Sequence, residues 1–366
     1  MPGIASSGAG SGTSTIMKVA VIGATGNVGT AVLRALERDA RVRQVVGIAR
    51  RLPSSDVLAA APKARFASVD IGRADHEQAL ERALAGADAV IHLAWLIQPS
   101  RRPEVMEAVN VGGSRRVFAA ALAAGVGTIV HASSVGAYSP GPKDRAVDES
   151  WPTGGIDSST YSRHKAQVER ILDEVEAAHP HVRVVRLRPG LIFQRDAASE
   201  IRRYFIGPLL PGALVRPSRI PVVPRTDRLT FQAVHADDVA EAYRLVTAER
   251  DVRGAFNIAA DPVLDADALA RVLHARAVPV GARFLRAAAD LTWRARLQPA
   301  DAGWIDMARG VPVMDTTRAR TELGWTPQRS AGDALLELLK GLSEGDGGAT
   351  PPLLPEAVAG RGRAGG

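Results

Sequence analysis

The sequence contains no cysteine among its 366 residues. The chain therefore has no disulfides and no thiolate metal ligands, which excludes a disulfide-stabilised scaffold and a cysteine zinc site. Aromatic residues make up only 4%, without a stripe suited to stacking nucleic-acid bases. No apolar run reaches the roughly 18 residues that a membrane-spanning helix needs. The 46% of hydrophobic residues that the chain does contain supports a large buried core. The absence of cysteine fits a cytoplasmic location, which we expect.

Acidic residues are outnumbered by basic ones, which gives a formal net charge of +7. Most basic side chains are arginines scattered through an Ala- and Gly-rich sequence, and they form no basic block. This distribution favours an ordinary basic surface over a nucleic-acid-binding patch. We therefore expect neither a nucleic-acid partner nor a membrane partner.

The two ends of the chain differ from the middle in composition. Residues 1–16 are mostly Gly, Ser, Ala and Thr, which predicts a disordered leader. This segment lacks the basic and long apolar stretches of a secretory signal. Residues 343–366 are rich in Gly, Pro and Arg, and we predict a disordered tail there.

The most informative stretch is residues 17–29, MKVAVIGATGNVG. A short apolar run ends in Gly23, glycines recur at Gly26 and Gly29, and an amphipathic run follows. This pattern predicts a buried strand, a tight turn and a helix start. Such a turn brings backbone N–H groups and the positive end of a helix dipole to a pyrophosphate. Glycines in series also mark simple turns. Their position between a Val/Ile strand and a helix favours dinucleotide binding.

Apolar strands then alternate with amphipathic helices. This rhythm predicts an α/β fold with a doubly wound, parallel Rossmann sheet, whose ligands bind at the carboxyl ends of the strands. The predicted strands cover residues 44–49, 65–69, 88–94, 128–132 and 182–187, and the predicted helices cover residues 75–85, 103–124 and 161–178.

The predicted Rossmann domain spans residues 17–192, and residues 193–342 form a smaller, mainly substrate-binding region. Within that region, segments around 231–259 are expected to return to the Rossmann core. Asp237 is the predicted cap of the helix that follows it, because a carboxylate can accept from free N–H groups there.

Charged residues follow the second and third predicted strands. Arg50 and Arg51 stand where NAD-preferring sites usually carry an acid, and guanidinium groups suit the 2′-phosphate of NADP(H). The alternative is an ordinary exposed pair in an arginine-rich protein. Asp70 can accept from the adenine amino group or belong to a turn. His92 is expected to be a packed histidine, and no metal site is predicted.

A catalytic constellation follows the fifth strand. Ser134 stands at the strand end, and the i, i+4 spacing places Tyr161 and Lys165 on one face of the next helix. An ammonium lowers the pKa of a neighbouring phenol from about 10 and makes it a usable acid or base. Lys165 can also hold the cofactor ribose, and Ser134 can bind the substrate oxygen. A Ser/His/Asp hydrolase is disfavoured because the sequence has no G-x-S-x-G elbow.

With these motifs, the sequence resembles the extended branch of the short-chain dehydrogenase/reductase superfamily, the NAD(P)-dependent epimerases and dehydratases. The resemblance covers residues 17–342 in order. The matching segments are the glycine-rich turn, Asp70 and Ile71, His92 to Ala94, Asn110 with Gly113 and Ser114, Ser133 and Ser134 with Tyr138, Tyr161 with Lys165, Arg188 and Pro189, residues 234–240, 256–258 and 315–327. It implies that Ser134 is catalytic, that Asn110 lies near the cofactor pocket, and that residues 189–192 lie along the nicotinamide.

The motifs and the resemblance together give a set of expected site residues. The expected catalytic residues are Ser134, Tyr161 and Lys165. The expected cofactor-binding residues are Gly23, Thr25, Gly26, Asn27, Val28, Gly29, Arg50, Arg51, Asp70, Ile71, Leu93, Ala94, Asn110, Ser133, Tyr161, Lys165, Pro189 and Ile192. The expected substrate contacts are Trp95, Ser134 and Tyr161, with Leu96, Ile97, Leu209, Leu210 and Trp293 as further candidates.

One departure from the family bears on the substrate. Nucleotide-sugar members resemble one another in an Arg-Asp-Phe-x-His pattern whose arginine helps to hold the sugar nucleotide. Here Phe231 falls at the arginine, and only Arg225 or Arg228 could replace its charge from nearby. A less charged carbonyl substrate is therefore favoured.

The sequence predicts an NAD(P)-dependent oxidoreductase that moves a hydride between the nicotinamide and a ketone or secondary alcohol. NADP(H) is the preferred cofactor and NAD(H) the alternative. One alternative function is a nucleotide-sugar epimerase or dehydratase that retains NAD. Another is a non-catalytic NADP(H)-sensing protein. Relatives often form dimers through helices equivalent to residues 103–124 and 161–178, so a homodimer is a further expectation.

Overall fold

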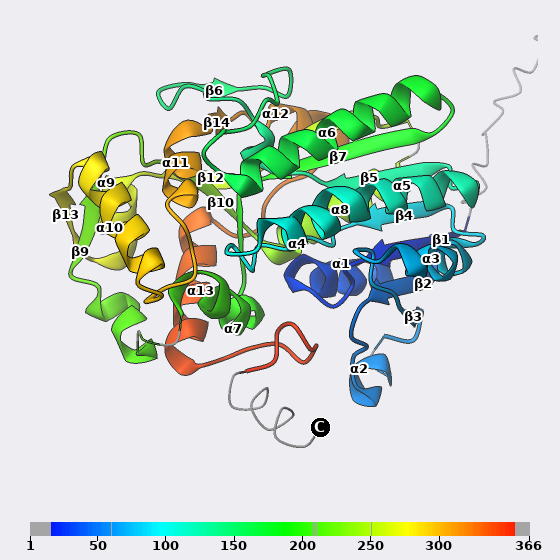
Figure 1. Cartoon of the computed structure of the whole chain (residues 1–366), viewed down its shortest axis with the longest axis horizontal. Coiled ribbons are helices and arrows are strands. Elements are labelled where there is room, and N and C mark those ends of the chain that lie inside the picture. Colours follow the sequence, from blue (N-terminus) through cyan, green and yellow to red (C-terminus); the bar gives the residue numbers. More distant parts are fainter. Residues whose placement is uncertain (1–15, 60, 208, 210, 250, 356–366) are drawn as a thin grey trace, which may run out of the picture.

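The computed structural model describes residues 16–59, 61–207, 209, 211–249 and 251–355, and a seven-stranded parallel sheet forms its centre (Figure 1). Its parallel pairing confirms the predicted doubly wound α/β fold. In spatial order, the strands are β11 (Gly254–Ile258), β7 (Arg183–Pro189), β5 (Thr128–Ala132), β4 (Ala89–His92), β1 (Met17–Ile22), β2 (Val42–Ala49) and β3 (Ala64–Ser68).

Helices cover both faces of this sheet (Figure 1). Val19 and Val21 of β1 pack on one side, while Ala20 and Ile22 pack on the other. All four are buried, which is why the strand reads as a continuous apolar run. The first face carries α1 (Asn27–Arg38) and α8 (Ala236–Ala248), and the second carries α3 (Glu77–Leu84), α5 (Gly113–Ala123) and α6 (Thr160–Ala178).

The strand order reverses at β1, which lies between β2 and β4. Connections on the two sides of this point leave in opposite directions, so a crevice opens beyond the carboxyl ends of β1 and β4. The glycine-rich turn follows β1 directly, and residues 93–97 follow β4. The fold therefore directs the candidate site to this crevice.

The smaller region covers that crevice from the carboxyl side. Its strands β10 (Phe231–His235) and β12 (Ala260–Leu264) form one sheet with β8 (Leu191–Phe193), which lies at the boundary with the preceding region. Strand β9 (Val222–Arg225) pairs with β13 (Arg276–Pro279), and β6 (Ala146–Val147) of the preceding region pairs with β14 (Val313–Met314) of the smaller region. Its helices are α7 (Ala198–Ile201), α9 (Ala266–Leu273), α10 (Ala282–Arg294), α11 (Gly303–Gly310), α12 (Thr317–Leu323) and α13 (Ala331–Glu344). Across the described residues, no helix has the length and apolar character to cross a membrane.

Two local predictions need correction. The helix expected over residues 103–124 is α4 (Pro103–Glu107), a π-helical segment over residues 108–112, and then α5. The cap of α8 is His235, whose Nδ1 accepts from the Asp237 N–H at 3.1 Å. Asp237 itself lies in the first turn, where its carboxylate pairs with Arg34 at 2.8 Å. A short α2 (Ser55–Ala59) also precedes β3.

The predicted disordered tail is also wrong over residues 343–355. Helix α13 continues to Glu344, and the chain then folds back over the crevice with Leu353 only 1% exposed. Thr350 Oγ1 donates to the Thr25 carbonyl at 2.7 Å, and Ser199 Oγ donates to the Leu353 carbonyl at 2.6 Å. A few specific bonds hold a segment whose composition gives no apolar pattern. Residues 1–15 of the predicted leader and residues 356–366 lie outside the described residues.

Candidate active site

The glycine-rich turn requires glycine for space. Gly23 has φ +87°, and a Cβ on it would lie 2.7 Å from the Ala94 N atom. A Cβ on Gly29 would lie 2.2 Å from the Gly23 carbonyl oxygen. Helix α1 begins with Gly26 as N-cap, without a side-chain cap or an acidic residue in its first turn. Its first N–H groups are therefore left for an anion, which fits a dinucleotide pyrophosphate.

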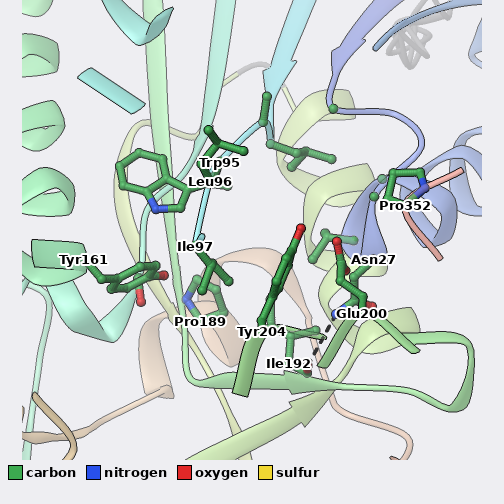
Figure 2. A pocket seen from close by; sticks show the side chains of 18 of the residues that line it. Asn27, Trp95, Leu96, Ile97, Tyr161, Pro189, Ile192, Glu200, Tyr204 and Pro352 are labelled. Atoms are coloured by element: carbon green, nitrogen blue, oxygen red, sulfur yellow. Dashed lines mark hydrogen bonds between the residues drawn. The ribbon is translucent and has the colours of Figure 1, made fainter. Parts of the chain in front are cut away.

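A cavity of about 570 Å³ extends from this turn to the start of α6. Figure 2 shows side chains from several segments that line it, among them Asn27, Ile97, Tyr161, Glu200 and Pro352. The predicted residues that line it are Gly23, Thr25, Gly26, Asn27, Val28, Gly29, Arg50, Arg51, Asp70, Ile71, Leu93, Ala94, Trp95, Leu96, Ile97, Ser133, Ser134, Tyr161, Lys165, Pro189 and Ile192. Their individual binding roles remain predictions.

Some expected contacts lie elsewhere. Asn110 is buried, and its side-chain amide bonds to the backbone of Leu96 at 2.7 and 2.9 Å, so it holds a wall segment of the cavity from outside. Trp293 donates to Ser100 Oγ at 3.1 Å and does not line the cavity. Leu209 is 63% exposed. Leu210 lies outside the described residues.

Ser134, Tyr161 and Lys165 meet at the inner end of the cavity. Ser134 stands just beyond β5, where its Oγ accepts from the Gly136 N–H at 3.0 Å. Tyr161 is the second residue of α6, and its phenol shares a hydrogen bond with the Ser134 side chain. Lys165 follows one helical turn later and donates from Nζ to the Ala132 carbonyl at 2.7 Å. A serine hydroxyl and a phenol thus lie together at this end of the cavity.

The electrostatics of this group differ from the expectation. Burial raises the pKa of Tyr161 to about 12, although the hydrogen bond with Ser134 opposes the shift. Burial also lowers the pKa of Lys165 well below its usual range, while the Glu169 carboxylate acts against that shift. Desolvation therefore sets the direction of the Tyr161 pKa shift, and the expected lowering is wrong. The Lys165 ammonium instead lies 3.4 Å from the centre of the Trp95 ring.

A buried ion pair supports the strand end that carries Ser134. Arg188 donates to both oxygens of Glu169 at 2.9 and 3.0 Å and to the Tyr138 hydroxyl at 3.1 Å. Glu169 also accepts from Ser133 Oγ. The Ser133 hydroxyl is thus committed to this network, although the residue lines the cavity as predicted.

The histidines near the strand ends are packing residues. His92 is fully buried with Nε2 2.9 Å from Ser114 Oγ, and burial lowers its pKa to about 3. It is therefore neutral, in agreement with the predicted packed histidine. His131 is also buried, and burial lowers its pKa. The described part of the chain has no cluster of three or more residues arranged to hold a metal ion.

At the opposite end of the cavity, Arg50 and Arg51 are exposed at its rim beyond β2. Asp70 follows β3, and its Oδ1 accepts from the Gly72 N–H at 3.0 Å, which gives it the turn role as well as a cavity-facing position. Glu200, bonded to Tyr204, lines the same cavity, and burial raises the pKa of its carboxyl to about 7.

The wall beyond Tyr161 is aromatic. The Trp304 ring lies 4.9 Å from Tyr161 and 4.8 Å from Phe205 between ring centres. Met307 completes this wall. Further lining residues come from short helical segments of the smaller region and from the C-terminal segment, whose places in the fold no local pattern predicts. Sequence analysis therefore missed Glu200, Tyr204, Phe205, Trp304, Met307 and Pro352.

Neither candidate replacement for the missing sugar-nucleotide arginine reaches the cavity. Arg225 pairs with Asp267. Arg228 donates to the Gly141 carbonyl at 2.6 Å. Among the described residues, the arginines that line the cavity are Arg50 and Arg51, both at the far end from Tyr161. The inner end therefore has no guanidinium for a phosphate.

Comparison with known proteins agrees with this site. The model of the NAD dependent epimerase/dehydratase family matches residues 19–259, more than half of the chain. A protein of Stigmatella aurantiaca described as 4-hydroxy-2-methyl-3-oxo-4-farnesyl-3,4-dihydroquinoline-1-oxide ketoreductase is 28% identical over 84% of this chain and 92% of its own. An uncharacterized protein of Mycobacterium tuberculosis is 28% identical over 87% of this chain. The aligned part makes up only 29% of that relative's length.

Among solved structures, DesIV, a dTDP-glucose 4,6-dehydratase from Streptomyces venezuelae with NAD and TYD bound, is similar in fold. Its TM-score is 0.65 with 21% identity, over 90% of this chain and 97% of that one. At this identity the likeness concerns the fold alone. With the family match over residues 19–259 and the glycine cradle, the chain belongs to the NAD dependent epimerase/dehydratase family.

Proposed function

We propose that this enzyme interconverts an apolar ketone and its secondary alcohol, with NADP(H) as the preferred cofactor. The observation that carries the proposal is the aromatic, arginine-free wall around Tyr161, built by Trp95, Phe205 and Trp304. Such a wall offers a large apolar contact area and no charge for a phosphate. The Stigmatella aurantiaca relative, described as a ketoreductase, supports this choice.

The chain's own residues supply the proton chemistry. When bound, the reduced nicotinamide supplies the hydride that adds to the carbonyl carbon. The Ser134 hydroxyl holds the carbonyl oxygen, and Tyr161 gives its proton to that oxygen as charge develops there. The addition of one hydride and one proton yields the alcohol. The indole N–H of Trp95 has no hydrogen-bond partner among the described residues, and it is a further donor for a substrate oxygen.

The proposed preference for NADP(H) rests on Arg50 and Arg51. Both guanidinium groups stand at the rim of the cavity beyond β2, and no ion pair is recorded for either of them among the described residues. Arginine binds phosphate with charge-assisted, often bidentate hydrogen bonds. The cofactor-binding roles of the glycine-rich turn and of Lys165 are part of the same proposal, as are the cytoplasmic location and the homodimer.

Titration of NADPH and NADH with nicotinamide fluorescence tests this preference. The double variant Arg50→Ala/Arg51→Ala is expected to lose NADPH affinity by at least about tenfold and to keep NADH affinity, because charge-assisted bonds contribute about 1.5–3 kcal/mol. Arg43→Ala, at an exposed β2 position, is the matched control. Equal losses for both cofactors would contradict the assignment.

A nucleotide-sugar epimerase or dehydratase is the second candidate, and the family match is the observation that favours it. Such an enzyme keeps its NAD through turnover. The two functions separate in one purification, because an epimerase would carry tightly bound NAD and turn over a nucleotide sugar without net NADPH consumption. The proposed reductase instead binds NADPH from solution and consumes one per ketone.

A further inference from the structure

Helix α10 (Ala282–Arg294) presents large apolar side chains to solvent. None of its residues is buried, and Phe284 and Leu291 are 71% and 68% exposed. They are seven residues apart, which places them on one line along the helix two turns apart, with exposed Ala287 between them. Leu297, just beyond the helix, is 49% exposed. Large exposed apolar side chains in line mark an interaction surface.

Arginines border this apolar line. Residues 283–296 contain four arginines against one aspartate, a net charge of +3. At about 100° per residue, Arg283 and Arg294 fall within a quarter turn of the line on the same side. Arg294 pairs with Asp290 at 2.9 Å, whereas no ion pair is recorded for Arg283 or Arg296 among the described residues. The outer face thus combines an apolar line with a basic edge.

The inner side of α10 is fixed to the walls of the cavity. Arg286 pairs at 2.9 Å with Asp306 of α11, the helix that carries Trp304 and Met307. Trp293 donates to Ser100 at 3.1 Å, and its ring lies 4.5 Å from the Arg101 guanidinium carbon. Residues 95–97, which precede Ser100 and Arg101 in the chain, line the cavity. The exposed line therefore lies on the outside of the aromatic end of the cavity.

We infer that α10 docks this enzyme on an anionic lipid surface, with Phe284 and Leu291 among the acyl chains and Arg283, Arg294 and Arg296 at the headgroups. A helix with an apolar line and a basic edge lies in the membrane interface without spanning it. The arginine stems reach past the apolar line to the headgroups. The inference stands independently of the substrate proposal and reverses the sequence-based expectation of no membrane partner.

The positive charge of α10 favours an anionic lipid surface over a second copy of this chain as the occupant of this face. Without Arg286, which pairs with Asp306 on the inner side, Arg283, Arg294 and Arg296 against Asp290 leave each α10 face a net +2. Two such faces repel one another, whereas an anionic leaflet attracts the same arginines. The formal net charge of +7 for the whole chain acts in the same direction. Apolar contact then holds the helix at short range.

Co-sedimentation of the full chain with vesicles tests the inference. We expect binding to vesicles of phosphatidylcholine mixed with phosphatidylglycerol, little binding to phosphatidylcholine alone, and release by salt. Phe284→Ser/Leu291→Ser and Arg283→Gln/Arg296→Gln should each weaken the partition coefficient at least about tenfold, because both apolar burial and basic charge drive interfacial binding.

Two control variants match these changes elsewhere on the surface. Arg38→Gln/Arg43→Gln removes two exposed charges, and Leu58→Ser removes an exposed leucine of α2. Both should bind as the unchanged chain does, and circular dichroism should show all variants folded. Failure of the unchanged chain to bind anionic vesicles would overturn the inference. So would a dimer in light scattering that Phe284→Ser/Leu291→Ser dissociates, since that result assigns the face to a second copy.

Discussion

The ammonium of Lys165 lies 3.4 Å from the centre of the Trp95 ring and donates to the Ala132 carbonyl at 2.7 Å. The face of an indole attracts a cation, so Trp95 favours the charged form of a lysine whose pKa is lowered by burial. The same ring also contacts Tyr161, with 6.0 Å between ring centres. Trp95 thus contacts both Lys165, a proposed cofactor-binding residue, and Tyr161, the proposed proton donor.

Replacement of Trp95 by leucine is therefore expected to lower the pKa of Lys165 further. A cation–π contact in a desolvated site contributes about 2 kcal/mol, so the loss of charge on Lys165 should occur at a lower pH. The pH profile of kcat/KM measures this shift, and Trp95→Phe should move it less. An unmoved profile with unchanged NADPH affinity would show that the ring has no such effect.

Glu200 predicts a pH dependence of cofactor binding. Its raised pKa of about 7 means that the carboxyl is neutral below that pH and negative above it. A negative carboxylate in the cavity repels an anionic dinucleotide, so NADPH binding should weaken as the pH rises through 7. In Glu200→Gln this dependence should disappear. Titrations on either side of pH 7 measure it.

Tyr204→Phe tests the same pH dependence by shifting it, whereas Glu200→Gln removes it. The hydrogen bond from Tyr204 lowers the pKa of Glu200, so its removal should raise that pKa and move the pH dependence of NADPH binding upward. If Glu200→Gln and Tyr204→Phe both keep the pH dependence of the unchanged chain, a group other than Glu200 causes it.

The C-terminal segment predicts a change in cofactor release. Thr350 donates to the carbonyl of Thr25 in the glycine-rich turn, and Pro352 lines the cavity. Thr350→Val keeps the shape and removes a hydrogen bond that contributes about 0.5–1.5 kcal/mol. NADPH dissociation should speed up about two- to tenfold in stopped-flow fluorescence. Thr321→Val, at an exposed site on α12, should leave the rate unchanged.

The network behind Ser134 carries a stability prediction. Glu169 lies between Arg186 and Arg188, which are both buried. Glu169→Gln leaves the buried Arg188 guanidinium without its carboxylate, a change that costs about 3–5 kcal/mol. Arg186 keeps its pairs with Asp173 at 2.7 Å and Glu176 at 2.6 Å. Urea unfolding should show this loss. Glu174→Gln, in an exposed pair with Arg115, should change the free energy of unfolding by less than about 1 kcal/mol.

Much of this fold follows from local patterns in the sequence. The apolar run ending at Gly23 predicts β1 and its turn because a buried parallel strand is apolar throughout. The i, i+4 spacing correctly places Tyr161 and Lys165 on one helix. Such features depend on neighbours along the chain, and so a single sequence contains them.

The parts that sequence analysis missed depend on contacts between distant segments. Glu200 of α7 and Trp304 of α11 reach the cavity from short helices of the smaller region, and no local pattern predicts where these helices lie. Thr350 bonds to Thr25, which is 325 positions away in the chain. The local sequence around Thr350 is rich in Gly and Pro and by itself suggests disorder, because it contains no sign of this distant contact. Aspartate is a residue type typical of helix N-caps, yet His235 and not Asp237 caps α8. The lowered pKa expected for Tyr161 failed because desolvation cannot be inferred from spacing.

The proposed reductase activity is tested most directly with Tyr161→Phe. NADPH consumption is followed with a panel of aryl alkyl and cyclic ketones, and NADPH affinity is measured in parallel. The proposal predicts that the unchanged chain reduces at least one ketone, and that the variant binds NADPH equally well but reacts at least about 100-fold more slowly, because general acid catalysis contributes about 10²–10⁴-fold. Retained turnover in Tyr161→Phe would contradict the assigned role. Epimerisation of a nucleotide sugar with retained NAD would contradict the proposed function.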